Sequence, residues 1–517
     1  MLLLGTTAAL GVIAERLRLP APVLLVLGGI GLAMLPSMTP MPLRPETVFL
    51  LFVPPLLYRA ALNMSLFELR RRVRGIAFLS ITMVLATMII VAVAAHAVIP
   101  GLPWAAAFVL GAIVSPPDSV AAISLTRSVR LPRSIATLLR GEGLVNDAAA
   151  FVAYRIAVAA LVSDTFSVKD AAVGFVTAAG VGVAIGIAVG WTIARLRERM
   201  RDMPVVENTI SLLTPFAAFV PAEQLGASSV LAVVATGLYL GYWAPRTISP
   251  TTRLRANAMW DMIVFLLEGL IFVLVGLELP RALDAISGYA PTSLALWGAV
   301  IAAAVILSRM VLVIPRPYLE GALRRWRGHP RPLPAWSRVL FVSWAGVRGG
   351  ESLVIALALP LTTVAGSILP ARDLIIFLTF AVILSTLVVQ GLTFGMLARV
   401  LGIQGDADDE REEASARAHL RRVGAERLSS QLRAGALAPG AAMQARALLR
   451  LDVDGVATPK VLGEVFDAQR TALLGLFDAG RVSDEVMRRL LQELDLQVAL
   501  LGENGADRHP LARHGQA

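Results

Sequence analysis

Two acidic residues and an asparagine interrupt the apolar stretch LLRGEGLVNDAAAFVAY, residues 138–154. An ionisable side chain inside a membrane costs about 3 kcal/mol or more unless it is paired or faces water, so Glu142 and Asp147 are candidate functional residues. In a helix, Asp147 shares a face with Gly143, and Glu142 shares the adjacent face with Asn146. A buried carboxylate can bind a proton or coordinate a small cation, and these are the kinds of chemistry open to such residues.

A further acidic residue, Asp118, follows the two prolines of GAIVSPPDSVAAIS. The prolines remove two backbone donors and clash with the preceding turn, so we expect the helix to break close to Asp118. Irregular backbone at membrane depth is tolerated only where protein buries it or where it lines a cavity. Asp118 either caps the freed amides of Ser119 and Val120 or coordinates an ion. We adopt the second interpretation, with Ser115 and Ser119 as candidate modifiers of the site.

The segment SWAGVRGGESLVIALALP, residues 343–360, predicts a second break. Three glycines around Arg348 weaken the helix at a comparable depth, and Glu351 follows. Two interrupted spans in corresponding places of the chain predict a transporter built as an inverted repeat, with its substrate site where the broken helices meet. Six spans, a connecting seventh and six more make the fifth and twelfth spans equivalent.

Arg309 and Glu268 also lie inside apolar spans and therefore need partners. Glu142 and Arg309 form one candidate pair, which would fix helix positions rather than carry ions, because removing either partner leaves a buried charge. The alternative places Glu142 at the membrane interface near Arg140.

The composition assigns the chain to the membrane proteins. Its 517 residues are 56% hydrophobic and 16% charged, which is too apolar for a soluble protein of this length. A hydrocarbon core about 30 Å thick requires roughly 17–25 apolar residues per helix. We predict an all-α polytopic membrane protein with about 13 transmembrane helices, two of them discontinuous crossing helices. The predicted spans are 2–14, 21–37, 47–63, 74–98, 104–126, 135–162, 170–194, 205–222, 226–244, 258–279, 291–315, 338–361 and 371–399.

Basic residues gather in alternate loops. The loop containing RRRVR, residues 70–74, is an example of the rich set, and the loop with the single Lys169 belongs to the poor set. The positive-inside rule places the rich set and the C-terminus in the cytoplasm and the N-terminus outside, in the cell (inner) membrane. The net charge of +10 then points to anionic lipid headgroups as partners and not to nucleic acid.

The chain contains no cysteine. This excludes disulfides, Cys-ligated zinc, iron–sulfur clusters and thiol chemistry. We expect no cofactor.

After Leu401 the sequence becomes charged and helical in pattern. We predict a transmembrane domain over residues 1–401 and a small helical cytoplasmic domain over residues 402–517. Ser483 is the predicted N-cap of a helix in that domain, and the last dozen residues are predicted to be disordered.

The motif GEGLVND resembles the GESLLND segment of the monovalent cation:proton antiporters of the first type, which include bacterial sodium/proton antiporters and animal sodium/proton exchangers. SPPDSVA, WAGVRGG, LTPFAAFV and VLAVVATGLYLG, and the order in which they occur, support the resemblance over roughly residues 10–400. It implies an inverted-repeat fold, with a core domain that moves against a dimerisation domain, in a homodimer.

The resemblance also implies residue roles. Asp147 would be the carboxylate that binds the ion and the proton, with Asn146 as its partner and Asp118 beside them at the unwound crossing helix. Na⁺ or K⁺ would bind at Asp147 and Asp118. Glu142 would pair with Arg309, and Arg348 would lie at the second crossing helix.

Three positions depart from the family pattern. Gly143 stands where the family commonly has Ser, Arg59 in VPPLLYRAALNM where many members have an acid, and Glu351 where they have an apolar residue. Arg59 and Glu351 are therefore treated as modifiers of the site, as is Glu268, the acid inside an apolar span, and the ion is Na⁺ or K⁺.

The expected function is exchange of a monovalent cation, Na⁺ in the first place, for H⁺. Asn146 stands where related electrogenic carriers have a second acid, so one-for-one electroneutral exchange is expected. One alternative is a transporter of another solute, such as an organic anion attracted by Arg348 and Arg59. The other is an intramembrane aspartyl enzyme using Asp118 with Asp147, whereas the antiporter is not an enzyme.

Overall fold

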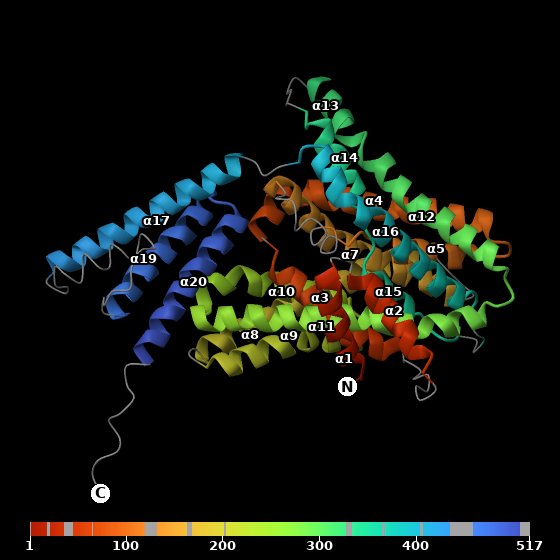
Figure 1. Ribbon diagram of the computed structural model, residues 1–517, viewed down its shortest axis with the longest axis horizontal. Coiled ribbons are helices and arrows are strands. Elements are labelled where there is room, and N and C mark those ends of the chain that lie inside the picture. Colours follow the sequence, from red (N-terminus) through yellow and green to blue (C-terminus); the bar gives the residue numbers. More distant parts are fainter. Residues whose placement is uncertain are drawn as a thin grey trace, which may run out of the picture. The chain divides into compact units, whose positions relative to one another are not determined.

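The computed structural model describes residues 2–17, 21–35, 45–64, 66–118, 122, 132–162, 168–200, 203–326, 333–363, 367, 369–403, 407–434 and 459–506. Helices dominate these ranges, which confirms the all-α prediction (Figure 1). The predicted disordered end falls outside the described residues. The helices are α1 (Leu2–Leu17), α2 (Ala21–Ala33), α3 (Pro45–Leu62), α4 (Leu66–Val98), α5 (Trp104–Val114), α7 (Arg133–Val162), α8 (Val168–Arg199), α9 (Pro204–Gln224), α10 (Ser229–Thr247), α11 (Pro250–Ala285), α12 (Pro291–Val313), α13 (Arg316–Trp326), α14 (Trp336–Trp344), α15 (Gly350–Leu357), α16 (Arg372–Val400), α17 (Ala407–Arg433), α19 (Pro459–Asp478) and α20 (Asp484–Ala506).

The described residues include eight helices that are long and apolar enough to cross a membrane. Two shorter apolar helices, α2 and α5, join them. The prediction of many apolar spans is therefore confirmed, and the number 13 stays a prediction.

The chain divides into two compact units. The first comprises Met1–Leu196, Ile210–Pro245 and Trp260–Gln404. The second comprises Arg197–Thr209, Arg246–Met259 and Gly405–Ala517. The second unit therefore contains the C-terminal helices together with ends of the apolar helices α8 to α11.

Both predicted breaks are present in the first unit. Helix α5 ends at Val114, and residues 115–118 are not helical, as the two prolines require. Of the residues that follow Asp118, the structure describes only Ala122 before residue 132. Helices α14 and α15 are separated by the non-helical residues 345–349, the glycine-rich segment.

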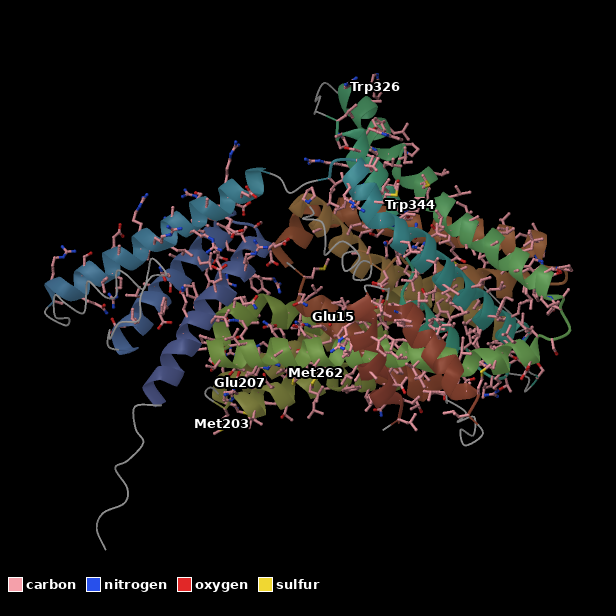
Figure 2. The ribbon with its side chains drawn as sticks, in the orientation of Figure 1. Glu15, Met203, Glu207, Met262, Trp326 and Trp344 are labelled. Atoms are coloured by element: carbon pink, nitrogen blue, oxygen red, sulfur yellow. The ribbon has the colours of Figure 1, made fainter. Side chains whose placement is uncertain are left out.

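Helix α14 ends at Trp344, close to the second break (Figure 2). The indole N–H of Trp344 donates a hydrogen bond to Thr393 Oγ1 of α16, over 3.0 Å. This bond ties the end of α14 to a long neighbouring helix.

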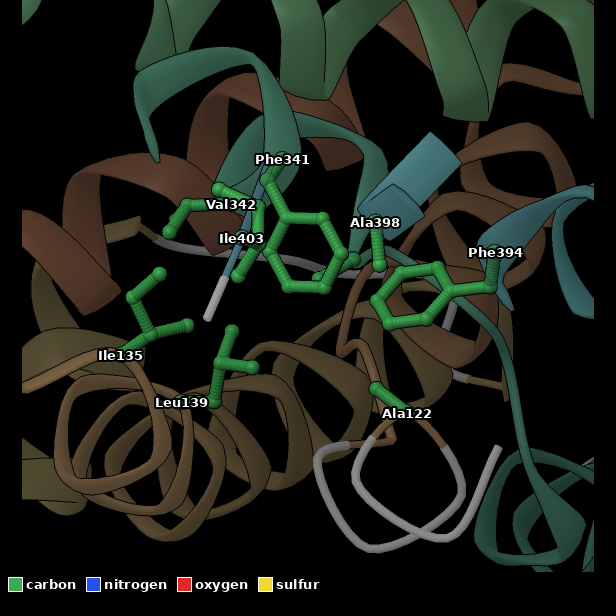
Figure 3. Close-up of a cluster of buried hydrophobic side chains, with 9 residues drawn as sticks. Ala122, Ile135, Leu139, Phe341, Val342, Phe394, Ala398 and Ile403 are labelled. Carbon is green, nitrogen blue, oxygen red and sulfur yellow. The ribbon is translucent and has the colours of Figure 1, made fainter. Parts of the chain in front are cut away.

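A hydrophobic cluster holds α7, α14 and α16 together beside the break (Figure 3). Phe341 of α14 and Phe394 of α16 pack with their ring centroids 4.7 Å apart and a tilt of 49°. Ile135 and Leu139 supply the α7 side of the cluster. Because these side chains are almost fully buried, the cluster fixes α7 relative to the break between α14 and α15.

Ion pairs connect the second unit internally. Arg253, near the start of α11, donates from Nε and Nη2 to the two carboxylate oxygens of Asp495 in α20, each over 2.6 Å. Their side chains are 12% and 3% exposed. Arg246 Nη2 of α10 lies 2.6 Å from Asp478 Oδ1 of α19. Ser483 precedes α20 as predicted, but its buried Oγ lacks a hydrogen-bond partner among the described residues, so it does not act as the N-cap.

We expect Arg253→Ala to loosen α20. The substitution removes the bidentate partner of the buried Asp495, and breaking such a pair costs about 3–5 kcal/mol. Arg470 Nη2 is 4.0 Å from Asp495 Oδ1, which is too far to replace two short hydrogen bonds. Amide hydrogen exchange in α20 should accelerate by about 100-fold or more.

Arg246→Ala is the matched control. Its partner Asp478 is 54% exposed, so the loss should be about 1 kcal/mol or less. Equal exchange rates in the two variants would show that the Arg253 pair does not hold α20.

Candidate functional site

Asp147 lies near the middle of α7 and is half-buried. It lines a cavity of about 20 Å³ together with Glu351, near the start of α15. The remaining wall is apolar and comes from α3, α7, α15 and the first break. A cavity of this size holds about one water molecule or one small ion. The other lining residues are Val53, Leu56, Leu57, Pro116, Phe151, Val354 and Ile355.

Asp147 and Glu351 thus bring two carboxyl groups to one small cavity. Two ionised carboxylates at one site repel each other, and a proton or a cation between them would relieve that repulsion. Sequence reasoning named Glu351 only as a modifier and did not pair it with Asp147.

Asp118 joins the two breaks. Its backbone N–H donates to Val347 O over 2.8 Å. Its carboxylate packs directly against Gly349, the residue that precedes α15. A negative charge is stabilised there, because the free N–H groups of a helix N-terminus carry a partial positive charge. Asp118 thus lies at the crossing point, as the sequence predicts, and is a charged neighbour of Asp147.

Arg348 is the positively charged residue where the two breaks meet. It is 1% exposed. Its Nε donates to Val114 O over 2.7 Å, at the end of α5, and its Nη1 donates to Gly346 O over 2.9 Å. A cation is favourable beside the free carbonyls of a helix C-terminus. Arg348 therefore holds the end of one broken helix to the break in the other.

The predicted pairing of Glu142 with Arg309 is present in the structure. Arg309 Nη1 and Nη2 donate to the two Glu142 oxygens over 2.6 and 3.0 Å. Both side chains are buried, with 2% exposure for Arg309 and 4% for Glu142. This bidentate pair links α7 to α12.

Asn146 lies one turn from Glu142. Its Nδ2 donates to Glu142 Oε1 over 3.4 Å. Its Oδ1 is buried without a hydrogen-bond partner among the described residues. The contact with Glu142 follows from their spacing of four on one helix face, and a role for Asn146 beside Asp147 stays a prediction.

The remaining predicted modifiers lie elsewhere or make local bonds. Arg59 Nη2 forms an ion pair with Asp261 Oδ1 of α11 over 2.7 Å. Ser115 Oγ donates to Ala112 O over 3.0 Å. Glu268 is half-buried on α11, and Ser119 falls outside the described residues.

No group of three or more His, Cys, Asp or Glu side chains within the described ranges is arranged to hold a metal ion.

The comparison with protein families decides the identity of the chain. Residues 2–400 match the family described as sodium/hydrogen exchanger, transmembrane. The chain belongs to this family. The exchanger is therefore a multi-pass membrane protein that exchanges monovalent cations for protons.

Individual relatives of the chain are named as cation/proton exchangers or antiporters as well. An uncharacterized Na⁺/H⁺ exchanger of Mycobacterium bovis is 35% identical over 509 residues, covering 94% of this chain and 92% of its own length. A sodium, potassium, lithium and rubidium/H⁺ antiporter of Bacillus pumilus is 33% identical over 389 residues, covering 74% of this chain and 58% of its own length. The solved structure of a sodium proton antiporter from Methanocaldococcus jannaschii has a TM-score of 0.58 at 20% identity, covering 77% of this chain and 97% of the other. The last comparison shows a shared fold.

We expect Gly349→Ala to impair the exchanger strongly. An added Cβ would overlap Asp118 Oδ2, and the carboxylate would have to leave the start of α15. Displacing a charged group at the crossing by about 1 Å should lower the rate of cation-driven proton movement by about tenfold or more.

The neighbouring Gly350→Ala is the control. Its added Cβ would meet Ile271 Cγ2 at 3.3 Å, and that side chain can shift. If both variants transported equally well, the packing of Asp118 against Gly349 would be unimportant for exchange.

Proposed function

We propose that Asp147 is the carrier group of this exchanger and that it binds Na⁺, or alternatively K⁺, in competition with H⁺. The observation that carries the proposal is the small cavity between α7, α3, α15 and the first break, with Asp147 in its wall. The loaded site alternates between the two sides of the membrane, and the unloaded charged site does not cross. Exchange is then obligatory, because each crossing requires either a cation or a proton on Asp147.

We propose one-for-one, electroneutral exchange. The Glu142–Arg309 pair is internally neutral, so it supports a structural role and leaves Asp147 as the group on α7 that changes its charge. The amide of Asn146 does not titrate, which removes a second acid from that position.

The charges at the crossing argue against transport of an organic anion. The guanidinium of Arg348 donates to two backbone carbonyls. Arg59 is engaged by Asp261. An anion would have to compete with these partners and would also meet Asp118 and Asp147. The same Asp118 and Asp147 do not form a hydrolytic pair in our proposal, and we assign no enzymatic activity or cofactor to the chain.

We further propose a homodimer in the cell (inner) membrane, with anionic lipid at its basic loops. The N-terminus lies outside and residues 402–517 form a cytoplasmic domain. The alternation of basic loops supports this orientation.

The test is cation-dependent proton flux in proteoliposomes. Purified protein is exposed to Na⁺, K⁺, Li⁺ or Rb⁺ gradients at several pH values, with the membrane potential clamped or free. We expect Na⁺ to drive proton movement at the same rate in both conditions. A rate that depends on the clamp would overturn electroneutrality, and flux driven only by anion gradients would overturn the assignment to cation exchange.

A further inference from the structure

Asp147 and Glu351 place two carboxyl groups at one cavity, and the assignment of Asp147 alone does not use the second. The two carboxyl groups share one small cavity, where two negative charges would repel each other. With one proton between them, the pair has a net charge of −1. Either carboxylate can accept a hydrogen bond from the other when the other holds the proton.

The charged residues around Asp147 and Glu351 favour a constant net charge of −1 on this pair. Asp118 and Arg348 are the charged neighbours of the pair, one of each sign. Behind them the Glu142–Arg309 pair is neutral in sum.

In the part of the chain that the structure describes, the helices packed around α15 present apolar or uncharged groups at the contact. Helix α3 presents Val53, Leu56 and Leu57 to the cavity. Helix α11 presents Ile271 and Phe272 at Gly350. From α16, Thr386 Oγ1 accepts the backbone N–H of Arg348 over 3.1 Å. Burying a second net charge in this apolar wall would be costly.

We propose that the exchanged proton is the one shared by Asp147 and Glu351, and that the transported cation replaces it between the two carboxylates. This inference rests on the proposed role of Asp147 and deepens it, since it makes Glu351 a second cation ligand. On cation entry the O–H bond breaks, the proton leaves to water, and one oxygen from each carboxylate contacts the cation. On cation release a proton from water restores the O–H bond.

The charges balance in this exchange. The protonated pair has a charge of −1, and two carboxylates with one monovalent cation also have a charge of −1. One cation therefore replaces one proton. A cavity of about 20 Å³ admits the cation only after it loses most of its water, and two carboxylate oxygens replace part of that hydration.

The first test is Glu351→Gln, which keeps the size and hydrogen bonding of the side chain and removes its charge. The apparent KM for Na⁺ should rise about tenfold or more, with the maximal rate within a few-fold of the unsubstituted protein. Asp147 loses the carboxylate that helps to hold its proton, so the pH of half-maximal exchange should fall by about one unit. Glu351→Asp keeps the charge and should restore part of both changes.

Glu15→Gln is the matched control, because Glu15 is an exposed carboxylate on α1 (Figure 2). It should leave the KM and the pH profile unchanged. An unchanged KM and pH profile in Glu351→Gln would overturn the inference, as would a loss confined to the maximal rate, which is what a structural role predicts.

A second measurement uses the unsubstituted protein and does not depend on how a variant folds. Infrared difference spectra should show the band of a protonated carboxyl disappearing when Na⁺ is added. Absence of that change would overturn the inference. Retained exchange in Asp147→Asn would instead overturn the proposed function, so the two failures are distinguishable.

Discussion

Asp147→Asn is expected to abolish cation-driven proton movement in everted membrane vesicles, a loss of about 100-fold or more. The amide neither binds a proton at physiological pH nor neutralises a cation, so both loaded forms of the carrier disappear. The side chain keeps nearly the same volume in a cavity of about 20 Å³, so the protein should still be produced and inserted. The measurement is the recovery of a pH-sensitive dye signal after addition of Na⁺ or K⁺.

Asp284→Asn provides the control, since Asp284 is an exposed acid near the end of α11. It should transport at the normal rate. Retained exchange in Asp147→Asn would show that another group carries the ion.

Glu142→Gln is expected to lower the thermal stability of the protein strongly. The substitution removes the carboxylate from Arg309, which is 2% exposed. Breaking a buried pair by removing one partner costs about 3–5 kcal/mol, because the other charge stays in place without compensation. The melting temperature of the purified protein in detergent should fall accordingly.

The double variant Glu142→Leu with Arg309→Met is the informative comparison. Replacing both charges with apolar residues of similar size is often neutral or stabilising. The double variant should therefore melt closer to the unsubstituted protein than Glu142→Gln does. If it melted at a lower temperature than the single variant, the pair would contribute more than its desolvation costs.

Hydropathy predicted the bounds of several membrane helices closely. The predicted spans 47–63, 291–315 and 371–399 end within two residues of α3, α12 and α16. Helix α11 extends well beyond the predicted span 258–279 at both ends. Hydropathy reports where a segment is apolar, and a helix continues into polar sequence as long as its residues favour it.

The charged residues were predictable where the sequence restricts the choice of partner. Arg309 is an intramembrane cation that needs an acid, and Glu142 is its partner in the structure. The bond between Asn146 and Glu142 follows from their spacing within one helix.

The contact between Asp147 and Glu351 was not predictable in the same way. The two residues are far apart in the sequence, and whether they meet depends on the direction in which α15 leaves the glycine-rich break. That direction is set by contacts such as the bonds of Arg348 to Val114 O and Gly346 O, which no local pattern encodes. The unusual acid at position 351 was the available signal.

The ion pairs of the second unit affect how the protein should be dissected. The composition changes after Leu401, which suggests a place to shorten the chain. Truncation there would also remove Asp478 and Asp495, the partners of Arg246 and Arg253 at the ends of α10 and α11. Altered transport in a shortened protein would then combine the loss of the tail with damage to the ends of apolar helices, and a full-length protein carrying Asp495→Asn would report the second effect separately.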